Sequence, residues 1–247
     1  MIDPPPLTWR SPPSPPTLGE EEIHLWLIPC ARGDDNLDPG QQQAADGGSS
    51  PQSLWSILST AEQDRASRFR LSRHRQAYVR AHAGLRLILA GYLDQPPPLI
   101  RFDLGPQGKP RVGGPWEFNL TTSGGLALVA IRLAYPVGID CEPIRADRDM
   151  LAIARRLFSP GEIEQLLSCP ASDRPWLFTR FWTALEARVK MDGYGLFHRP
   201  SAPSTPPPGI VHFSPRAGYL AAIASPRIPP PILWQTLRLS LDEMPLG

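Results

Sequence analysis

The stretch Val137-Gly-Ile-Asp-Cys-Glu-Pro143 places a strand with paired acids near the middle of this chain of 247 residues. Side chains two residues apart on a strand point to the same face. Asp140 and Glu142 therefore share one face, and the residue between them faces the other way. Paired carboxylates suit Mg²⁺, which prefers oxygen ligands and takes others from water and substrate phosphates. A solvated acidic strand end is the alternative for these two residues taken alone.

The residues before this strand predict a first set of α+β elements. Residues 23–28 alternate apolar and polar side chains, which indicates a β-strand. Residues 53–93 have helical periodicity, with Ser59 and Glu62 spaced as a capping box, and predict one long helix. Further strands are expected where short β-branched or aromatic runs lie between Gly and Pro residues, at 102–104, 116–120 and 127–133.

The residues after it predict a second set. Strands are expected at 137–141, 211–213 and 219–224. Helices are expected at 149–158, 160–167 and 176–191. Ser159 is the expected N-cap of the second helix, and Gly193 and Gly195 end the third. The element order β, α, β, β and then β, α, α, α, β, β predicts an α+β fold of two similar halves that meet near Tyr135.

Proline is the compositional anomaly, with 32 residues concentrated in a few segments. Proline cannot donate a backbone hydrogen bond, so the segment at residues 4–16 is expected to be extended and poorly packed. The sequence thus predicts three parts: a proline-rich disordered tail, an N-terminal α+β half, and a C-terminal α+β half that carries the acids. Their bounds are 1–21, 22–134 and 135–247.

Composition argues against several classes of protein. The formal net charge is +1, from 25 basic and 24 acidic residues, which disfavours a nucleic-acid-binding protein held by a strong overall positive field. The longest apolar stretches fall well short of the roughly 20 residues that a membrane helix requires, and no signal peptide is visible. The three cysteines have neither zinc-site spacing nor a disulfide pattern. A cytoplasmic protein with no membrane and no nucleic-acid partner is therefore expected.

A second candidate site lies on the helix expected at 176–191. Glu186 and Lys190 are four residues apart and therefore lie on one helix face, which Trp182 shares. Such a pair either forms a surface ion pair or places an acid and a base beside one reacting group. Taken alone, the spacing favours the ion pair.

A third candidate is the glycine-rich turn Gly105-Pro-Gln-Gly-Lys-Pro110 with the run Phe118-Asn-Leu-Thr-Thr-Ser-Gly-Gly125 that follows it. A lysine, hydroxyl groups and backbone amides at glycine turns could together bind phosphate. The turn is not a P-loop, because Pro110 replaces the Ser or Thr that would contact the metal. By itself, the turn is more typical of a β-turn.

Arginines are dense in the helical region at 53–93, and they form either a solvated face or an anion-binding wall. They are Arg65, Arg68, Arg70, Arg73, Arg75, Arg80 and Arg86. The five histidines show no metal-ligand spacing, so each is expected at the surface or in helix packing.

Taken together and in this order, the motifs resemble those of the Sfp-type 4′-phosphopantetheinyl transferases. The resemblance runs from about residue 59 to residue 195, and the last expected strand is also similar to the last strand of that family. The motifs are Gly-Lys-Pro at 108–110, Phe-Asn-Leu-Thr-Thr-Ser-Gly-Gly at 118–125, Val-Gly-Ile-Asp-Cys-Glu at 137–142, Phe-Ser-Pro-Gly-Glu at 158–162 and Trp-Thr-Ala-Leu-Glu-Ala-Arg-Val-Lys at 182–190.

The resemblance implies a pseudo-dimer, with two α+β halves in one chain and coenzyme A in the cleft between them. It implies transfer of 4′-phosphopantetheine from coenzyme A to a serine of an apo acyl or peptidyl carrier protein, with release of 3′,5′-ADP. Asp140, Glu142 and Glu186 fall on the metal-binding acids of the family, which hold Mg²⁺. Glu186 would also take the serine proton, and Lys190 would stabilise or protonate the departing 3′,5′-ADP.

The resemblance also implies which residues bind coenzyme A. Lys109 would contact the nucleotide phosphates, and Thr121 and Thr122 align with positions near the adenosine 3′-phosphate. Further phosphate contacts are expected from Arg65, Arg80 and Arg86. Because both halves of the cleft lie in one chain, the expected form is a monomer.

Two positions depart from the family pattern. Thr122 stands where the family commonly has a His that contacts the 3′-phosphate, so a hydrogen-bond donor is kept but a potential positive charge is lost. Leu185 stands where the family has a Lys before the metal-binding Glu. These departures motivate an alternative, a catalytically weakened homologue that binds coenzyme A or a carrier protein without efficient transfer. A scaffold whose proline-rich tail recruits a partner is a further alternative.

Overall fold

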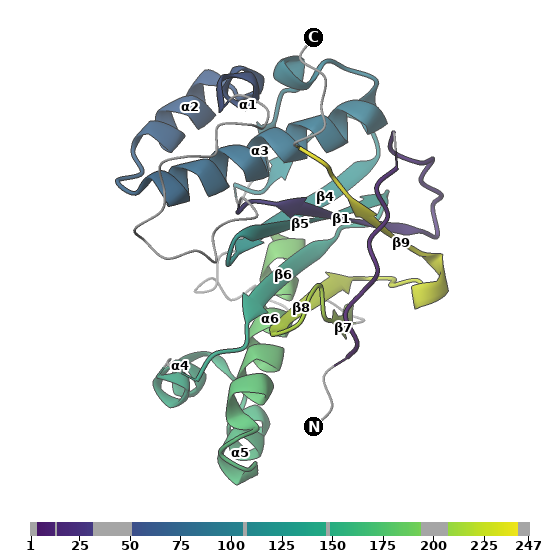
Figure 1. Ribbon diagram of the computed structural model, residues 1–247. Coiled ribbons are helices and arrows are strands. Elements are labelled where there is room, and N and C mark those ends of the chain that lie inside the picture. The colour runs from purple at the N-terminus through teal and green to yellow at the C-terminus, as the bar shows by residue number, and fades with distance from the viewer. Residues whose placement is uncertain are drawn as a thin grey trace.

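Two β-sheets packed against one another form the centre of the molecule (Figure 1). The computed structural model describes residues 4–12, 14–31, 51–105, 108–146, 149–193 and 207–241. The first sheet has the order β4-β5-β1-β9, formed by Trp116–Ser123, Leu126–Leu133, Ile23–Pro29 and Trp234–Arg238. The second has the order β6-β8-β7, formed by Gly138–Pro143, Tyr219–Ser225 and Gly209–Phe213. A small separate pair consists of β2 (Asp103–Leu104) and β3 (Pro110–Arg111).

Helices cover the outer faces of both sheets (Figure 1). The group over the first sheet is α1 (Pro51–Ile57), α2 (Thr60–Ser67) and α3 (Ser72–Leu93). The group at the second sheet is α4 (Met150–Leu157), α5 (Pro160–Ser168) and α6 (Arg174–Asp192). Helix α6 packs across β6 and β8, and α4 and α5 pack against its N-terminal part. Two short 3₁₀ helices are η1 (Pro97–Leu99) and η2 (Pro231–Leu233).

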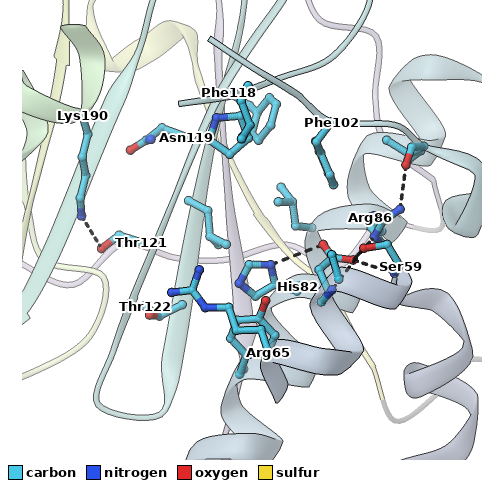
Figure 2. A pocket seen from close by; sticks show the side chains of 18 of the residues that line it. Ser59, Arg65, His82, Arg86, Phe102, Phe118, Asn119, Thr121, Thr122 and Lys190 are labelled. Atoms are coloured by element: carbon cyan, nitrogen blue, oxygen red, sulfur yellow. Dashed lines mark hydrogen bonds and ion pairs between the residues drawn. The ribbon is translucent and has the colours of Figure 1, made fainter. Parts of the chain in front are cut away.

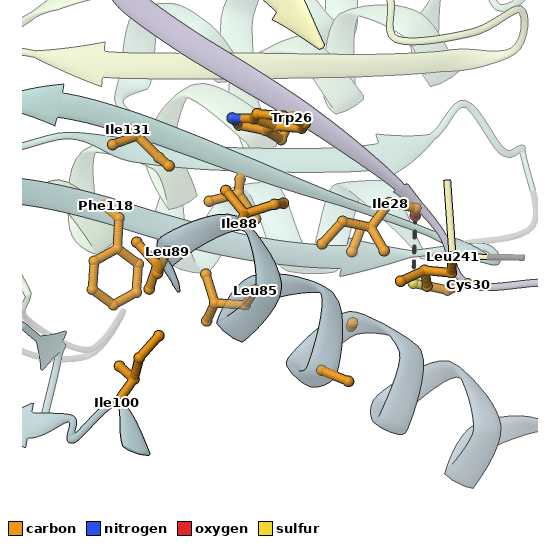
Figure 3. Close-up of a cluster of buried hydrophobic side chains, with 14 of the residues drawn as sticks. Trp26, Ile28, Cys30, Leu85, Ile88, Leu89, Ile100, Phe118, Ile131 and Leu241 are labelled. Carbon is orange, nitrogen blue, oxygen red and sulfur yellow. Dashed lines mark hydrogen bonds between the residues drawn. The ribbon is translucent and has the colours of Figure 1, made fainter. Parts of the chain in front are cut away.

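Alternation along the strands sends apolar side chains into two cores. In β1, Leu25 faces the second sheet, whereas Trp26 faces α3. Figure 3 shows the core under α3, where Leu85, Ile88 and Leu89 of the helix point toward the sheet and belong to one buried cluster with Phe118 and Ile131. Each fully buried aliphatic side chain stabilises the fold by about 1.5–3 kcal/mol. The apolar stripe of α3 therefore fixes this helix on the first sheet.

The two sheets share a strand order. With β9 left aside, each sheet has three strands in the described part of the chain, and the third strand in sequence lies between the first and the second. β5 lies between β1 and β4, and β8 lies between β6 and β7, with antiparallel pairing in every case. A long helix precedes the second of these three strands in each sheet: α3 comes before β4, and α6 comes before β7. The predicted α+β fold class is confirmed. The repeated strand order supports the expectation of two similar halves.

The helical region differs from the single long helix that the sequence predicts. The chain leaves the helix at 58–59 and again at 68–71, which gives three helices. The capping box explains the first break, because the Glu62 carboxylate accepts hydrogen bonds from the amide and the hydroxyl of Ser59, each at 2.8 Å. The apolar periodicity continues across both breaks. The sequence pattern alone therefore predicted one continuous helix.

The last strand is one that the sequence pattern did not predict. β9 pairs in parallel with β1, from Ile23 opposite Trp234 to Leu27 opposite Arg238. Residues from the C-terminal part of the chain therefore belong to the first sheet. Parallel pairing joins segments that are far apart in sequence, so a local pattern carries little signal for it. β4 also continues to Ser123, beyond the predicted end at 120.

The N-terminal proline-rich segment lies along both sheets, where the sequence predicts a disordered tail. The amide of Leu7 donates to the carbonyl of Ser214 at 2.9 Å, and the amide of Arg10 donates to the carbonyl of Thr236 at 3.0 Å. Leu7 and Trp9 pack against the core between the sheets. Proline lacks only its own N–H, so the residues between the prolines still donate hydrogen bonds and anchor the described part of the segment.

Replacing Trp9 by Ala is expected to lower the free energy of unfolding by about 2 kcal/mol. The change removes a half-buried ring from the core between the sheets and a hydrogen bond of 2.9 Å from Nε1 to the carbonyl of Pro215. Urea unfolding at neutral pH measures the effect, with the exposed Pro5→Ala as control. An unchanged unfolding free energy for Trp9→Ala would contradict the placement of this segment.

Candidate active site

The candidate site begins where β4 of the first sheet meets β6 of the second. Alternate side chains of β4 face β6 and hydrogen-bond to it in sequence order. The three hydrogen bonds join the Asn119 side chain to the amide of Ile139 at 2.9 Å, the Thr121 hydroxyl to Asp140 at 3.1 Å, and the Ser123 hydroxyl to Glu142 at 3.3 Å. The two acids of β6 are therefore oriented by hydroxyl groups from the other sheet.

Helix α6 approaches β6 closely because β6 begins with a glycine. A Cβ atom at Gly138 would overlap the carbonyl oxygen of Ala187 and the amide nitrogen of Met191. The backbones of strand and helix are thus in direct contact, and the helix side chains nearby come within reach of the strand acids. Lys190 Nζ lies 2.6 Å from Asp140 Oδ1, so the close approach of helix and strand allows an ion pair between Lys190 and Asp140.

Three carboxylates and one lysine meet at this junction. The side chain of Asp140 is 5% exposed, and its Oδ2 has no hydrogen-bond partner among the described residues. Burial raises the pKa of Glu186, and the ammonium of Lys190 opposes this. Repulsion from Asp140 and Glu142 raises that pKa further. The excess of negative charge favours binding of a cation.

The chemistry of this donor set fits Mg²⁺. Carboxylate oxygens are ligands that Mg²⁺ prefers, and Asp140 Oδ2 is a buried acceptor that no described residue satisfies. As the side chains stand, no three His, Cys, Asp or Glu residues in the described part of the chain form a group that could hold a metal ion. Mg²⁺ commonly keeps waters and takes ligands from substrate phosphates, so a complete protein cage is not required.

These groups line one side of a cavity of about 1330 Å³. Helices α2 and α3 and the segment at 98–104 form the other side. Figure 2 shows Arg65 and His82 on the helical side, facing the strand that carries Thr121 and Thr122. The cavity brings together most of the predicted site residues, namely Arg65, Arg86, Thr121, Thr122, Asp140, Glu142, Glu186 and Lys190.

Arg86 lines the cavity, but its Nε and Nη1 donate hydrogen bonds within the protein. Its side chain is 2% exposed, and Nε donates to Glu62 Oε2 at 2.8 Å. Nη1 donates to the carbonyls of Pro97 and Ile100 at 3.1 and 2.9 Å. The guanidinium also lies over the ring of Phe102, 5.0 Å from its centroid. Arg86 therefore holds the cavity wall in shape, and its predicted phosphate contact stays a prediction.

Two predicted phosphate-binding residues are not among those that line the cavity. Lys109 Nζ donates to the carbonyls of Val137 and Met191 at 3.0 and 3.2 Å, which ties the turn before β3 to β6 and α6. Burial lowers the pKa of Lys109. Arg80 is 7% exposed, and its Nε donates to the carbonyl of Pro29 at 2.9 Å. The roles predicted for both residues remain predictions.

The cavity also contains residues that sequence reasoning did not assign to the site. Glu62 and His82 come from α2 and α3, and Phe102 and Phe118 add an apolar surface. The sequence singled out Glu62 only as part of a capping box, and His82 only as a residue within the helical periodicity of 53–93. These signals concerned helix formation and did not indicate a binding site.

Stability should depend on pH through Glu62. Burial raises the pKa of this carboxyl, but hydrogen bonds from His82, Ser59 and Arg86 lower it overall to about 2, from an ordinary value of 4.5. The ionised form is thus stabilised in the folded protein. Its contribution is fully present above pH 4.5 and is lost as the pH falls toward 2. The shift corresponds to about 3 kcal/mol.

Urea unfolding from neutral pH down to about pH 2 would compare the protein with Glu62→Gln. We expect a gap in unfolding free energy that is largest at neutral pH and closes as Glu62 becomes protonated. The exposed Asp64, also in α2, provides the matched control Asp64→Asn, for which the gap should stay small throughout. A gap for Glu62→Gln that does not change with pH would contradict the shifted pKa.

Known proteins are similar to this chain over the region that carries the candidate site. The profile of the ACPS family, the 4′-phosphopantetheinyl transferase superfamily, matches residues 136–214. The 4′-phosphopantetheinyl transferase HetI of Nostoc sp. is 37% identical over 194 residues, which covers 76% of each chain. The chain belongs to the 4′-phosphopantetheinyl transferase superfamily. The putative 4′-phosphopantetheinyl transferase slr0495 of Synechocystis sp. is 32% identical over 177 residues, 70% of this chain and 65% of the relative.

A third similar protein is the 4′-phosphopantetheinyl transferase psf-1 of Bacillus pumilus, which is 35% identical over 133 residues, 53% of this chain and 56% of the relative. The predicted class of enzyme, a phosphopantetheinyl transferase, is thus confirmed. Enzymes of this family use coenzyme A and act on carrier proteins. None of the helices in the described ranges combines the length and the apolar character needed to cross a membrane.

Proposed function

We propose that this phosphopantetheinyl transferase moves 4′-phosphopantetheine from coenzyme A to a serine of an apo acyl or peptidyl carrier protein and releases 3′,5′-ADP. The observation that carries the proposal is the junction of β4, β6 and α6, where acids, a lysine and hydroxyl groups line one cavity. Small-molecule sites usually span about 300–1,000 Å³. The larger volume of this cavity, about 1330 Å³, suits an extended ligand such as coenzyme A.

Glu186 and Lys190 are the proposed catalytic residues. Burial raises the pKa of Glu186, which makes its carboxylate a stronger base toward the serine hydroxyl, directly or through a water molecule. Lys190 presents its ammonium to the same cavity and would stabilise or protonate the departing phosphate of 3′,5′-ADP. The serine oxygen attacks the β-phosphate of coenzyme A, and the bond to the α-phosphate breaks. This chemistry requires mainly positioning and charge neutralisation.

Asp140, Glu142 and Glu186 are the proposed ligands of Mg²⁺. When bound, Mg²⁺ would supply neutralisation of the pyrophosphate charge and polarise the phosphate that is attacked. The hydroxyls of Thr121 and Ser123 donate to Asp140 and Glu142 at 3.1 and 3.3 Å. Such hydrogen bonds behind a metal ligand restrict the direction of the carboxylate, so β4 would help to set the geometry of the site.

The phosphates of coenzyme A are proposed to lie between α2 and β4. Arg65 of α2 and Thr121 and Thr122 of β4 line the same cavity from opposite sides (Figure 2). Guanidinium and hydroxyl groups are suitable donors for phosphate oxygens. Proposed contacts from Lys109 and Arg80 have less support, because neither residue lines the cavity, and Lys109 Nζ and Arg80 Nε donate hydrogen bonds to backbone carbonyls.

A weakened homologue is less well supported than an active enzyme. Leu185, one of the departures from the family pattern, packs against the core of α4, α5 and the N-terminal part of α6. An apolar residue at this position therefore has a packing role that does not involve the acids. Glu186 and Lys190, on the same helix, line the cavity. The second departure, Thr122, keeps its hydroxyl in the cavity lining.

We propose further that the enzyme acts as a monomer built from the halves 22–134 and 135–247. The junction of β4 and β6 supports this division, because each strand comes from one half and both contribute to the site. The last strand, β9, qualifies the division, since it joins the sheet of the N-terminal half. Size-exclusion chromatography with light scattering would test the monomer.

Intact-mass measurement of an apo carrier protein tests the proposed function. After incubation with this enzyme, coenzyme A and Mg²⁺, the carrier should gain about 340 Da, the mass of the added phosphopantetheine group. A metal chelator and the variant Glu186→Ala should each abolish the gain. No gain with any of a broad panel of carriers, despite measurable binding of coenzyme A, would favour the weakened homologue.

A further inference from the structure

The cavity continues past Thr122 into a second space of about 660 Å³, which we call the cationic arm. It shares Arg65, Tyr78, His82 and Thr122 with the main cavity. No Asp or Glu of the described residues lines it, and its basic lining residues are Arg65, Arg73, His74, His82 and Arg145. A space lined by cations and hydroxyl groups without a carboxylate is suited to a bound anion.

His82 lies at the boundary between the cationic arm and the main cavity. Its ring stacks on Tyr78, with 4.0 Å between the ring centroids. Its Nδ1 lies 3.6 Å from Glu62 Oε1 on the helical side. The two nitrogens of an imidazole ring lie on opposite sides of one carbon atom, so Nε2 points away from Glu62. No residue in the described ranges forms a hydrogen bond with Nε2.

Tyr78 also positions a guanidinium group. The guanidinium of Arg65 lies 5.7 Å from the centroid of the same ring. Figure 2 shows the Arg65 side chain passing beside His82 and reaching toward Thr122 on the opposite strand. One aromatic ring thus holds Arg65 and His82 side by side, and both face a hydroxyl group across the cavity. This set offers a guanidinium, an imidazole and a hydroxyl to one ligand group.

We propose that His82 is a specificity-determining residue, which binds the 3′-phosphate of coenzyme A together with Arg65 and Thr122. A phosphate monoester carries between one and two negative charges near neutral pH and has three strong acceptor oxygens, so it gains from several donors at once. The inference rests on the proposed function and adds to it. Position 122 has no imidazole, and His82 supplies one from helix α3 on the opposite side of the same ligand group.

Calorimetric titrations with coenzyme A and with dephospho-coenzyme A test this role. The full-length enzyme, with Mg²⁺ and without carrier protein, should bind coenzyme A more tightly. His82→Gln should weaken binding of coenzyme A by about tenfold or more and leave binding of dephospho-coenzyme A unchanged. Unchanged binding of dephospho-coenzyme A would show that the variant is folded. Arg75→Gln is the matched control, because it removes a positive charge from α3 without touching either cavity.

Returning an imidazole to the opposite strand provides a second test. The double variant His82→Gln with Thr122→His should recover most of the preference for coenzyme A, because the ring then approaches the same phosphate from β4. His82→Arg should keep the preference, since arginine also presents N–H donors to the phosphate. A loss of preference in His82→Arg, or no recovery in the double variant, would count against a direct phosphate contact.

The outcomes separate this inference from the proposed function. Equal weakening of both ligands by His82→Gln, or no preference in the unmodified enzyme, would overturn the role of His82 and leave the proposed function intact. Failure of the unmodified enzyme to bind coenzyme A at all would overturn the proposed function itself. A titration with inorganic phosphate tests for a site that binds the free ion. If the binding free energy of inorganic phosphate is as large as the difference between coenzyme A and dephospho-coenzyme A, the assignment to coenzyme A would be overturned.

Discussion

Replacing Gly138 by Ala is expected to destabilise the enzyme severely and to abolish transfer. The added methyl group would overlap the carbonyl oxygen of Ala187 and the amide nitrogen of Met191. Both are backbone atoms of α6, so the helix as a whole must move. Overpacking usually costs about 1–3 kcal/mol, and we expect the upper end because no flexible side chain can give way. Transfer should fall further than stability, since α6 carries Glu186 and Lys190.

Gly161→Ala is the matched control for this prediction. Gly161 lies near the start of α5, where an added Cβ atom has no neighbour within 4 Å. This change should leave transfer intact and raise the unfolding free energy by at most about 0.5–1 kcal/mol. Urea unfolding and the carrier-mass assay measure both variants. A Gly138→Ala enzyme as stable and active as the unmodified one would show that strand and helix are not in direct backbone contact.

Replacing Glu186 by Gln is expected to lower the rate of transfer by about 10²–10⁴-fold. The amide keeps the size of the side chain but cannot accept the serine proton as a base. It also removes one of three negative charges from the proposed Mg²⁺ site, so the Mg²⁺ concentration needed for half-maximal activity should rise. The ion pair of 2.6 Å between Lys190 and Asp140 does not involve Glu186, and folding should therefore be preserved.

Single-turnover transfer at saturating coenzyme A and Mg²⁺ isolates the effect of Glu186→Gln on the chemical step. The exposed Glu164 of α5 gives the control Glu164→Gln, which should transfer at the rate of the unmodified enzyme. Thermal unfolding of both variants checks the fold. A Glu186→Gln enzyme that retains more than about a tenth of the rate at saturating Mg²⁺ would exclude Glu186 as the general base.

The sequence predicted the residues of the candidate site as a set but not the geometry in which they lie. The alternation at 137–143 places Asp140 and Glu142 on one face of a strand, and a spacing of four places Glu186 and Lys190 on one face of a helix. How close helix and strand come depends on Gly138, which meets α6 only in the folded chain. The resemblance also implied phosphate contacts for Lys109, Arg80 and Arg86, and in the structure each of these side chains donates hydrogen bonds to backbone carbonyls.

Structural features that depend on near neighbours in the chain were determined by the sequence itself. They include the alternation of β1 and β6, the helix starts at Ser59 and Ser159, and the helix end at Gly193. Each depends on residues within about four positions, over which backbone geometry is fixed by local sterics and hydrogen bonds. The family motifs add to this because their order and spacing are also written in the sequence.

Only the tertiary structure decided the features that join distant segments. β9 pairs with β1 across most of the chain, residues 7–10 bond to Ser214 and Thr236, and His82 of α3 faces Thr122 of β4. Such contacts form when separate apolar faces are buried in common cores, and the free energy of that burial depends on the whole chain. No short stretch of sequence contains this information, which is why these features were absent from the sequence prediction.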